Sequence, residues 1–428
     1  MEIQKDRDIS EVVRDNLCMG CGTCFGLCPS GSITLAKNIQ AGEYQPTIKQ
    51  DKCTNCGICF AVCPGHTIDI PSLSSEFISA NFADERMGAY SNLYQGYACN
   101  NDLRYRCATG GMVTATLLYL LEKNLIDGAL VAHMPSDGTL TPRPVIARTS
   151  EDIVAAATSK YCPVPTNAGL KEILDISGRY AVVGLPCHLH GIRKAARINK
   201  KLRKRIVLHL GVFCGWNTPF TGTDFVIHQK KLKRSDVKSV AYRGEGWPGY
   251  NVFELNNGNK IKDDYHQYWD RNLSAFIPNR CRYCHDHTAE LSDVSYGDAW
   301  IPEIVSKDRM GTNLMIVRNS YAEDILRQMQ REDRIFLSPI ERRNVLESQH
   351  KCRWKKMNIA SRIKLAGMMG ESVPDYGATT FPAPSKHLLA DAAVEYLQFR
   401  LTSRRSLWWV LRLTSYLLDK IGYKPAHT

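Results

Sequence analysis

Eight of the sixteen cysteines in this chain fall into two copies of one spacing pattern. The first copy is Cys18-x2-Cys21-x2-Cys24-x3-Cys28-Pro29, and the second is Cys53-x2-Cys56-x2-Cys59-x3-Cys63-Pro64. A 4Fe–4S cube needs four thiolates, and in this doubled pattern the cysteine before proline ligates the other cube. We therefore predict one cluster on Cys18, Cys21, Cys24 and Cys63, and a second on Cys53, Cys56, Cys59 and Cys28. A zinc module needs only four ligands and no doubling.

Four of the remaining cysteines also stand in positions suited to metal binding. Cys187 and Cys214 each follow a short apolar run, and Cys281 and Cys284 form a two-ligand clip. Spacing alone leaves three interpretations open. These are a third iron–sulfur cluster, a zinc ion held by Cys281, Cys284, His285 or His287, and buried cysteines that bind no metal.

The cysteine content and the charge restrict the class of protein. The 428 residues include sixteen cysteines and carry a formal net charge of +12. The N-terminus is charged from its second residue, unlike a secretory signal, and no apolar run approaches the roughly 18 residues of a membrane span. We therefore expect a cytoplasmic protein whose thiols bind metal or do redox chemistry instead of forming disulfides.

A glycine pair before a predicted helix is suited to a planar or anionic cofactor. Thr109, Gly110 and Gly111 precede a helix predicted over 112–124 from its apolar spacing. Two glycines let the backbone lie close to a ring or a phosphate, and the start of a helix offers unpaired N–H groups. The alternative is that Thr109 is simply the N-cap of this helix.

These residues lie on a chain with several recognisable parts. A Pro/Ser-rich break follows the doubled motif. Alternating strand and helix patterns come next, with continuous apolar runs that predict buried strands before Cys187 and Cys214. The predicted parts are a ferredoxin-type domain (1–72), a linker (73–95), an oxidoreductase domain (96–340) and a C-terminal helical extension (341–428).

The segments around these residues resemble a known family. Over about residues 95–320 the chain contains, in this order, TGGMVTATLLYLLEKNLIDGA, SKYCPV, GLPCHLHGIRK, FCGWNTP, YRGEGWPG and CRYCHDHTAELSDVSYGDAW. They resemble the coenzyme F-420 hydrogenase/dehydrogenase beta-subunit family, which includes the deazaflavin-reducing subunit of archaeal hydrogenase and plant 7-hydroxymethyl chlorophyll a reductase. The N-terminal segment resembles the bacterial 2×4Fe–4S ferredoxin. The implied fold class is an α+β ferredoxin-like 2×4Fe–4S domain followed by an α/β flavin-binding domain.

The resemblance also implies cofactors and the residues that hold them. It implies a bound FAD and a third 4Fe–4S cluster on Cys187, Cys214, Cys281 and Cys284, with Cys162 outside the ligand set. It places Thr109, Gly110 and Gly111 at the flavin ring or pyrophosphate, Ser159 and Lys160 near flavin N1 or a phosphate, and Arg243 and Trp247 over the cofactor. From the residues alone, Lys160 is equally a solvated lysine and Trp247 a core residue. The sequence identifies no catalytic residue.

Basic residues are concentrated in two segments, eight of them within 193–205 and four within 230–234. Such patches attract acidic partners. We therefore expect an acidic electron carrier such as a ferredoxin, or a partner redox subunit, and the alternative is a solvated helix face. Nucleic acid is not expected, because no binding motif accompanies the charge.

The C-terminal segment predicts a basic amphipathic helix within 399–428. Its apolar stripe consists of Leu407, Trp408, Leu411 and Leu418, widened by Val410, Leu413 and Leu417. A basic helix with tryptophan can lie on an anionic membrane surface, so peripheral membrane contact is one interpretation. The alternative is packing against its own protein or a second subunit.

Together these features predict an iron–sulfur flavoprotein oxidoreductase. Electrons pass one at a time through the ferredoxin domain, a third cluster relays them to FAD, and the flavin exchanges two electrons with an organic substrate. The resemblance implies that this substrate is coenzyme F-420, a deazaflavin, or a related molecule. The alternatives are an electron-transfer subunit that feeds a partner enzyme, a reductase of another unsaturated organic substrate, and a zinc-bearing scaffold with a ferredoxin appendage.

Overall fold

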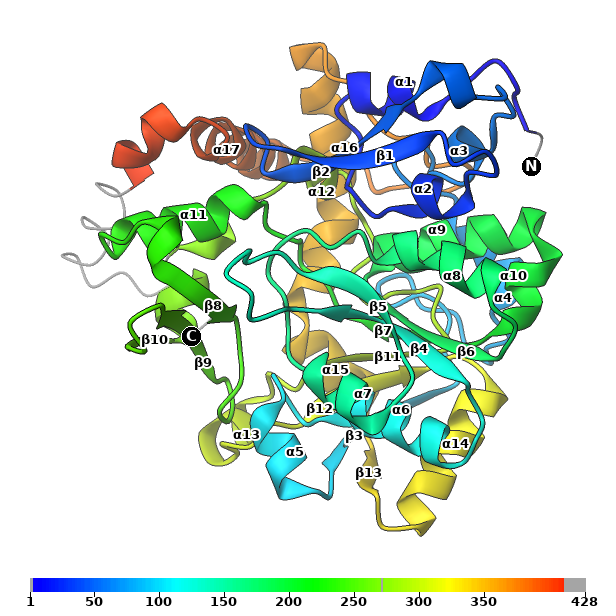
Figure 1. The fold of residues 1–428 in the computed structure, drawn as a ribbon, viewed down its shortest axis with the longest axis vertical. Coiled ribbons are helices and arrows are strands. Elements are labelled where there is room, and N and C mark those ends of the chain that lie inside the picture. Colours follow the sequence, from blue (N-terminus) through cyan, green and yellow to red (C-terminus); the bar gives the residue numbers. More distant parts are fainter. Residues whose placement is uncertain (1–2, 271, 412–428) are drawn as a thin grey trace.

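The computed structural model describes residues 3–270 and 272–411, and their arrangement is shown in Figure 1. The N-terminal unit contains α1 (Ile9–Arg14), α2 (Thr23–Leu27), β1 (Ile33–Asn38), β2 (Glu43–Ile48) and α3 (Ile58–Ala61), with a 3-10 turn at Gln50–Lys52. β1 and β2 form an antiparallel hairpin. Helices α2 and α3 each follow a glycine with positive φ, Gly22 at 86° and Gly57 at 70°. The repeated motif therefore folds twice into the same loop and helix.

The main domain is built on one mixed eight-stranded sheet in the order β13-β3-β12-β11-β7-β6-β4-β5. The strands are β3 (Asn92–Ala98), β4 (Gly128–His133), β5 (Arg143–Ala147), β6 (Tyr180–Gly184), β7 (Ile206–Val212), β11 (Val294–Asp298), β12 (Asn313–Val317) and β13 (Ile335–Pro339). The neighbours β4, β6, β7 and β11 are parallel, and the other pairs are antiparallel. The carboxyl ends of the parallel strands meet at one edge, where open α/β sheets place their sites.

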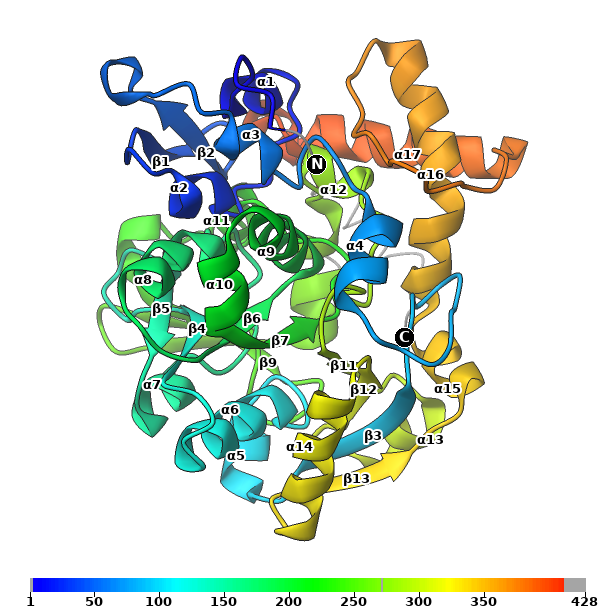
Figure 2. The same cartoon turned by 90° about the vertical axis from the view of Figure 1, so that its right-hand side faces the viewer.

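Helices cover both faces of this sheet (Figure 2). One hydrophobic core joins the sheet to α6 (Met112–Glu122) and α14 (Ser320–Arg331), and a second joins it to α8 (Leu170–Asp175), α9 (Pro186–Ile198) and α10 (Lys200–Arg205). Alternate residues of β4 face the two cores, Ala129 and Val131 one and Leu130 the other. Strands buried on both faces read as continuous apolar runs. The buried strands and the helix predicted over 112–124 are confirmed.

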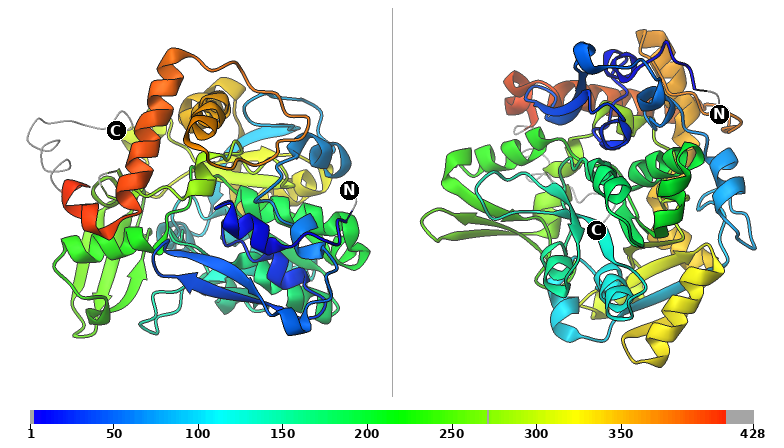
Figure 3. Two further views of the ribbon diagram at one scale, coloured as in Figure 1. Left: turned by 90° about the horizontal axis from the view of Figure 1, so that it is seen from above. Right: turned by 45° about the vertical axis from the view of Figure 1, so that its right-hand side comes forward.

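A smaller antiparallel sheet lies at the side of the molecule, where Figure 3 shows it in green. It consists of β8 (Val237–Ala241), β9 (Tyr250–Leu255) and β10 (Lys260–Asp264), and its core partner is α11 (Phe220–Gln229). Shorter helical elements are α5 (Asn101–Arg106), α7 (Ser150–Ala155), η2 (Thr166–Gly169), η3 (Arg234–Asp236), η4 (His266–Asp270), η5 (Leu273–Ala275), α12 (Asn279–Arg282) and α13 (Pro302–Lys307). Cys162 is fully buried in the core of the small sheet.

The segment predicted as a linker begins with a helix instead. In α4 (Ile70–Phe77), the Asp69 carboxylate caps the helix by accepting the N–H of Ser72 at 3.2 Å. Glu76 pairs with Arg197 at 2.6 Å and with Arg203 at 2.8 Å, which ties α4 to α9 and α10. The proline of this segment lies in the first helical turn, where it is tolerated. The Pro/Ser-rich composition therefore did not predict this helix, and the linker prediction for the rest of 73–95 stays a prediction.

The C-terminal part is helical, as predicted, and packs on the rest of the protein. It contains α15 (Arg342–Ser348), α16 (His350–Met369), α17 (Lys386–Thr402) and a 3-10 turn at Arg405–Leu407. Trp408 is only 6% exposed and packs against Phe225 and Phe276, so this part of the apolar stripe covers the protein itself. Leu413, Leu417 and Leu418 lie outside the described residues. Among the described helices none is long and apolar enough to cross a membrane.

The basic segment 193–205 is not one solvated face. Arg193 is buried and donates to Asp293 at 2.8 Å. Lys194 is also buried, and its Nζ donates to the carbonyl of Cys63 at 2.7 Å. The exposed basic residues of this segment lie on α10. The expected acidic partner would therefore meet a smaller patch than the sequence indicates.

Candidate functional site

The fold brings together the four cysteines predicted for one cluster. This first set consists of Cys18, Cys21, Cys24 and Cys63. Burial raises the pKa of these thiols, that of Cys21 to about 11, and their proximity raises it further. Backbone N–H groups donate to the sulfurs, from Gly20 to Cys18 at 3.4 Å and from Gly65 to Cys63 at 3.2 Å. Buried thiols with N–H donors fit a metal cluster, because the metal supplies the positive charge that thiolates need.

The second set lines a separate cavity of about 290 Å³. It consists of Cys28, Cys53, Cys56 and Cys59. Cys28 comes from the first motif, so the fold contains the exchange between motifs that the spacing predicts. Burial raises the pKa of Cys28, but the hydroxyls of Ser32 and Ser30, at 3.3 and 3.6 Å, lower it overall. The neighbours Lys52 and Thr54 are exposed, so this set lies at the surface.

The third set gathers at the carboxyl edge of the parallel strands. Cys187 lies just after β6, Cys214 just after β7, and Cys281 and Cys284 in and after α12. Burial raises the pKa of these thiols, and so does their mutual proximity, with that of Cys214 at about 12 and that of Cys281 at about 11. Four thiols from three separate segments therefore lie near one another, and the relay cluster that they would hold stays a prediction.

The first set neighbours each of the other two. Cys24 of the first set is close enough to Cys59 of the second for their thiolate charges to interact, and Cys187 of the third interacts in the same way with Cys21 of the first. The first set therefore lies between the other two. The series of three sets leads from the exposed edge of the N-terminal unit to the carboxyl edge of the main sheet.

Buried cations accompany the thiols. Lys194 contacts the Cys63 loop, and Arg280 donates to the carbonyls of Gly65 and Pro64 at 2.8 Å each. Near the third set, burial would lower the pKa of Lys355, but the neighbouring thiolates raise it overall. An oxidised 4Fe–4S cube with four thiolates carries a charge of about −2. These cations offset the charge that such clusters bring into the interior.

Lys194 provides a test of this arrangement that does not depend on turnover. Lys194→Gln should lower the reduction potential of the first-set cluster by on the order of 50–100 mV, because a nearby positive charge stabilises the more negative reduced cluster. An anaerobic redox titration followed by EPR measures the shift. Lys200→Gln, on the exposed face of α10, is the matched control. Equal potentials in the two variants would contradict a cluster beside Lys194.

The histidines considered as zinc ligands have other roles. His287 contacts the carbonyl oxygen of Cys214 through Nδ1 at 3.2 Å and Oε1 of Gln349 through Nε2 at 3.0 Å. His285 packs against the rings of Tyr376 and Phe381. Both ring nitrogens of His287 are thus engaged, which disfavours its use as a zinc ligand.

A polar network connects the third set to two residues predicted to cover the flavin. Asp298, the last residue of β11, accepts two hydrogen bonds from the Arg243 guanidinium at 3.0 and 2.8 Å and one from the Trp247 indole at 2.7 Å. Gln349 donates to the Asp298 carbonyl at 2.6 Å and also contacts His287. Neither Asp298 nor Gln349 is among the residues that the sequence motifs predict for this site. The available signal was an aspartate at the carboxyl end of a predicted strand.

The glycine turn before α6 packs against the protein. Gly111 has a φ of 75° and is the N-cap, with no side-chain cap. A Cβ on Gly110 would collide with the Asn313 side chain. The Thr109 hydroxyl donates to the carbonyl of Thr312 at 3.2 Å, so the N-cap interpretation of Thr109 is wrong. Packing and positive φ explain the glycines without a cofactor, and their contact with flavin stays a prediction.

Lys160 is not a solvated lysine. Its Nζ donates to the carbonyls of Ala157 at 2.7 Å and Thr158 at 2.9 Å, just after α7. Burial lowers its pKa to about 7. Ser159 is hydrogen-bonded to the side chain of Tyr161. This segment therefore holds a cation whose charge changes near neutral pH.

The loop between β8 and β9 lies beside that segment. Gly244, Gly246 and Gly249 form a G-x-G-x-x-G spacing that the sequence analysis missed, and all three have positive φ. The loop joins antiparallel strands, so it is not the strand-to-helix turn of a dinucleotide site. A Cβ on Gly244 would lie 3.8 Å from Thr158. Trp247 is buried with its ring 4.7 Å from that of Trp300, so it is a core residue as well as a member of the network.

The N-terminal unit carries two cysteine-rich motifs, and the mixed α/β sheet that follows has further cysteines at its carboxyl edge. These features define an iron–sulfur electron-transfer protein of the oxidoreductase type. Comparison with family models supports this class. Residues 17–66 match the 4Fe-4S dicluster domain. Residues 93–171 and 177–343 match the N-terminal and C-terminal models of the coenzyme F420 hydrogenase/dehydrogenase beta subunit. The chain belongs to this family, as the sequence motifs predict.

Similar proteins share this assignment. The chain is 28% identical over 262 residues to the coenzyme F420 hydrogenase subunit beta of Methanothermobacter thermautotrophicus, covering 60% of this chain and 86% of the relative. It is 26% identical over 354 residues to the coenzyme F420-dependent sulfite reductase of Methanocaldococcus jannaschii, covering 78% of this chain and 49% of the relative. A solved chain of the F420-reducing [NiFe] hydrogenase complex from Methanosarcina barkeri has the same fold, with a TM-score of 0.54 and 21% identity over 69% of this chain and 99% of the other.

Proposed function

We propose that this protein is a cytoplasmic, FAD-dependent iron–sulfur oxidoreductase. It passes electrons between a one-electron carrier of the ferredoxin type and an organic two-electron substrate, coenzyme F420 or a related deazaflavin. The observation that carries the proposal is the series of three cysteine sets, which runs from the protein surface to the polar network around Asp298. The names of the relatives in the family support F420 as the substrate.

Each group of residues has its own role in this electron transfer. The second set would hold the cluster nearest the surface, the first set the middle one and the third set the one at the sheet edge, and such clusters would supply one-electron transfer in either direction. Bound FAD supplies the conversion between one-electron and two-electron chemistry. Lys160, the Thr109–Gly111 turn, Arg243 and Trp247 hold it, and the Asp298 carboxylate fixes the guanidinium and the indole in place. Trp247, buried against the ring of Trp300, and Tyr265, whose ring lies 4.7 Å from the Arg243 guanidinium, limit the access of water to Arg243.

A second candidate function is an electron-transfer subunit within a larger assembly. The solved chain of the same fold is described as part of a hydrogenase complex. In that case the isolated chain carries electrons but requires a partner redox subunit for turnover. Reoxidation of the reduced protein by separate deazaflavin, nicotinamide and quinone acceptors in anaerobic stopped-flow distinguishes the two. Rapid oxidation by a deazaflavin alone supports the enzyme, and no oxidation by any acceptor supports the subunit.

The metal content follows directly from the three sets. Anaerobically purified protein should contain about 12 iron and about 12 sulfide per chain, four of each for every cube. Iron, zinc and acid-labile sulfide analysis provides the measurement. About 8 iron together with one zinc would contradict the third cluster and favour a zinc ion bound by Cys281 and Cys284.

Lys160 predicts a pH dependence for flavin affinity. Its ammonium is charged below a pKa of about 7 and loses the proton above it, so attraction to a flavin phosphate should weaken as the pH rises from 6 to 9. The three N–H donors of Lys160 go to the carbonyls of Ala156, Ala157 and Thr158. Lys160 therefore acts on a phosphate through its charge, and loss of that charge should weaken binding by about tenfold. Fluorescence titration of the flavin-free protein measures this, and Lys160→Gln should show a flat profile. If flavin affinity in Lys160→Gln depends on pH as it does in the parental protein, another group causes the pH effect.

A further inference from the structure

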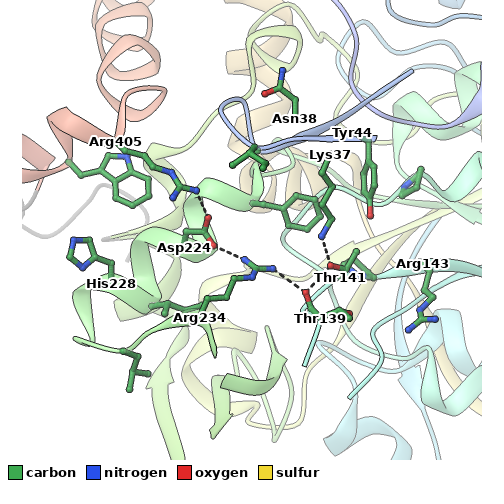
Figure 4. Close-up of a pocket in the computed structure, with 18 of the residues that line it drawn as sticks. Lys37, Asn38, Tyr44, Thr139, Thr141, Arg143, Asp224, His228, Arg234 and Arg405 are labelled. Carbon is green, nitrogen blue, oxygen red and sulfur yellow. Dashed lines mark hydrogen bonds and ion pairs between the residues drawn. The ribbon is translucent and has the colours of Figure 1, made fainter. Parts of the chain in front are cut away.

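A cavity of about 1040 Å³ lies between the N-terminal unit and the main domain (Figure 4). Its walls come from the β1–β2 hairpin, the β4–β5 connection, α11 and the C-terminal segment that carries Arg405 and Trp408. Its lining, as far as the chain is described, includes none of the residues proposed to hold flavin. This volume is at the upper end of the range for small-molecule sites.

The cavity carries an excess of positive charge. Lys37, Arg143, Arg234 and Arg405 line it, against the single carboxylate of Asp224, and Arg143 is paired with Asp137 outside the lining. Asp224 is already shared, because its two oxygens pair with Arg234 at 2.6 Å and with Arg405 at 2.7 Å. Figure 4 shows these three side chains converging on one side of the cavity.

Lys37 is the cation whose charge is least compensated. Within the described residues no carboxylate lies at ion-pair distance from its Nζ, which donates to the Thr141 hydroxyl. Burial lowers the pKa of Lys37, and the like charge of Arg234 lowers it further. Two cations that repel each other across a cavity favour an anion between them, and phosphate is the anion that Lys and Arg bind most readily.

The other walls are apolar and flat. Lys37 Nζ lies 4.4 Å from the centre of the Phe220 ring, and Tyr44 packs edge-to-face on Phe220 at 5.7 Å. Pro144 and Pro165 add apolar surface. Aromatic faces beside cations suit a planar ring that carries a phosphate.

We infer that this cavity binds a phosphorylated planar ligand of nucleotide size. Its phosphate lies between Lys37 and Arg234, and its ring lies against Phe220. The inference goes beyond the proposed function, because it assigns a second small-molecule site. The ligand would contact both the N-terminal unit and the main domain, which already meet here through the N–H of Phe220 and the carbonyl of Gly42 at 2.7 Å.

Calorimetric titration of the flavin-loaded and cluster-loaded protein with ADP, adenosine and pyrophosphate tests the inference. We expect saturable binding of ADP that is tighter than that of either part alone. Lys37→Gln should weaken ADP binding about tenfold or more, since it removes a charged hydrogen bond to phosphate. Lys200→Gln, an exposed lysine outside the cavity, should leave the affinity unchanged.

Four results would overturn the inference. The first two are the absence of saturable ADP binding, and equal ADP affinity in Lys37→Gln and Lys200→Gln. Another is release of flavin by ADP, which would show that the probe enters the flavin site. The last is that a hexaglutamate peptide competes with ADP for binding while pyrophosphate does not, which would assign the cavity to an acidic peptide. None of these results affects the proposed electron path, whose test is oxidation by deazaflavin.

Discussion

Cys281→Ser should slow electron transfer from the N-terminal clusters to the flavin by about a hundredfold or more, because a hydroxyl is a poor iron ligand in a thiolate site. Cys281 interacts with Cys284 and lies in the third set, near the polar network. The variant should lose about 4 of about 12 iron atoms. It should keep the EPR signals of the N-terminal clusters, whose ligands lie in another unit. Stopped-flow absorbance after reduction with a ferredoxin measures the rate.

Cys99→Ser provides the control for this experiment. Cys99 is an exposed free thiol that belongs to none of the three sets. The control should keep the parental iron content and rate, because its thiol ligates nothing. A parental rate in Cys281→Ser would remove the third set from the electron path and leave direct transfer from the first set.

Local patterns made much of the fold predictable. The doubled cysteine motif specifies two loops that begin helices in the same way, after Gly22 and Gly57. The apolar runs before Cys187 and Cys214 predict strands buried on both faces, and β6 and β7 confirm them. Each of these signals lies within about ten neighbouring residues, where side-chain period and backbone conformation are directly linked.

The network around Asp298 was not predictable in the same way. Arg243 and Gln349 reach Asp298 from 55 and 51 positions away in the chain. No periodicity relates such partners, since the topology of the sheet and not the local sequence places them together. The family resemblance nominated Arg243 and Trp247, but it did not identify the carboxylate that orients them.

Charge patterning is a poor guide to burial in this chain for a related reason. Arg193 and Lys194 stand in a basic run typical of a solvated helix, yet both are buried. Their partners, Asp293 and the carbonyl of Cys63, lie 100 and 131 positions away. A buried cation is stable when it is paired and hydrogen-bonded, so its burial depends on partners that the local sequence does not contain.

Replacing Asp298 tests whether the network holds the flavin. Asp298→Asn should reduce flavin affinity by about tenfold or more, because the Arg243 guanidinium loses its negative partner and one of the two oxygens that accept its hydrogen bonds. Leaving a buried charge unpaired also lowers the free energy of unfolding by about 3–5 kcal/mol. Flavin content after gel filtration, a fluorescence titration of the flavin-free protein and a thermal unfolding curve measure both effects.

Asp293→Asn separates the loss of flavin from the loss of stability. Asp293 lies just before the other end of β11, is buried, and pairs with Arg193 at 2.8 Å and His209 at 3.0 Å. Its replacement should lower the free energy of unfolding by about as much as Asp298→Asn does, since it too leaves a buried cation unpaired. It should leave flavin affinity at the parental value, because it lies away from the carboxyl edge of the sheet. Equal loss of flavin in both variants would show that Asp298 acts through stability alone, and the flavin would then have to be held by the Lys160 segment without the network.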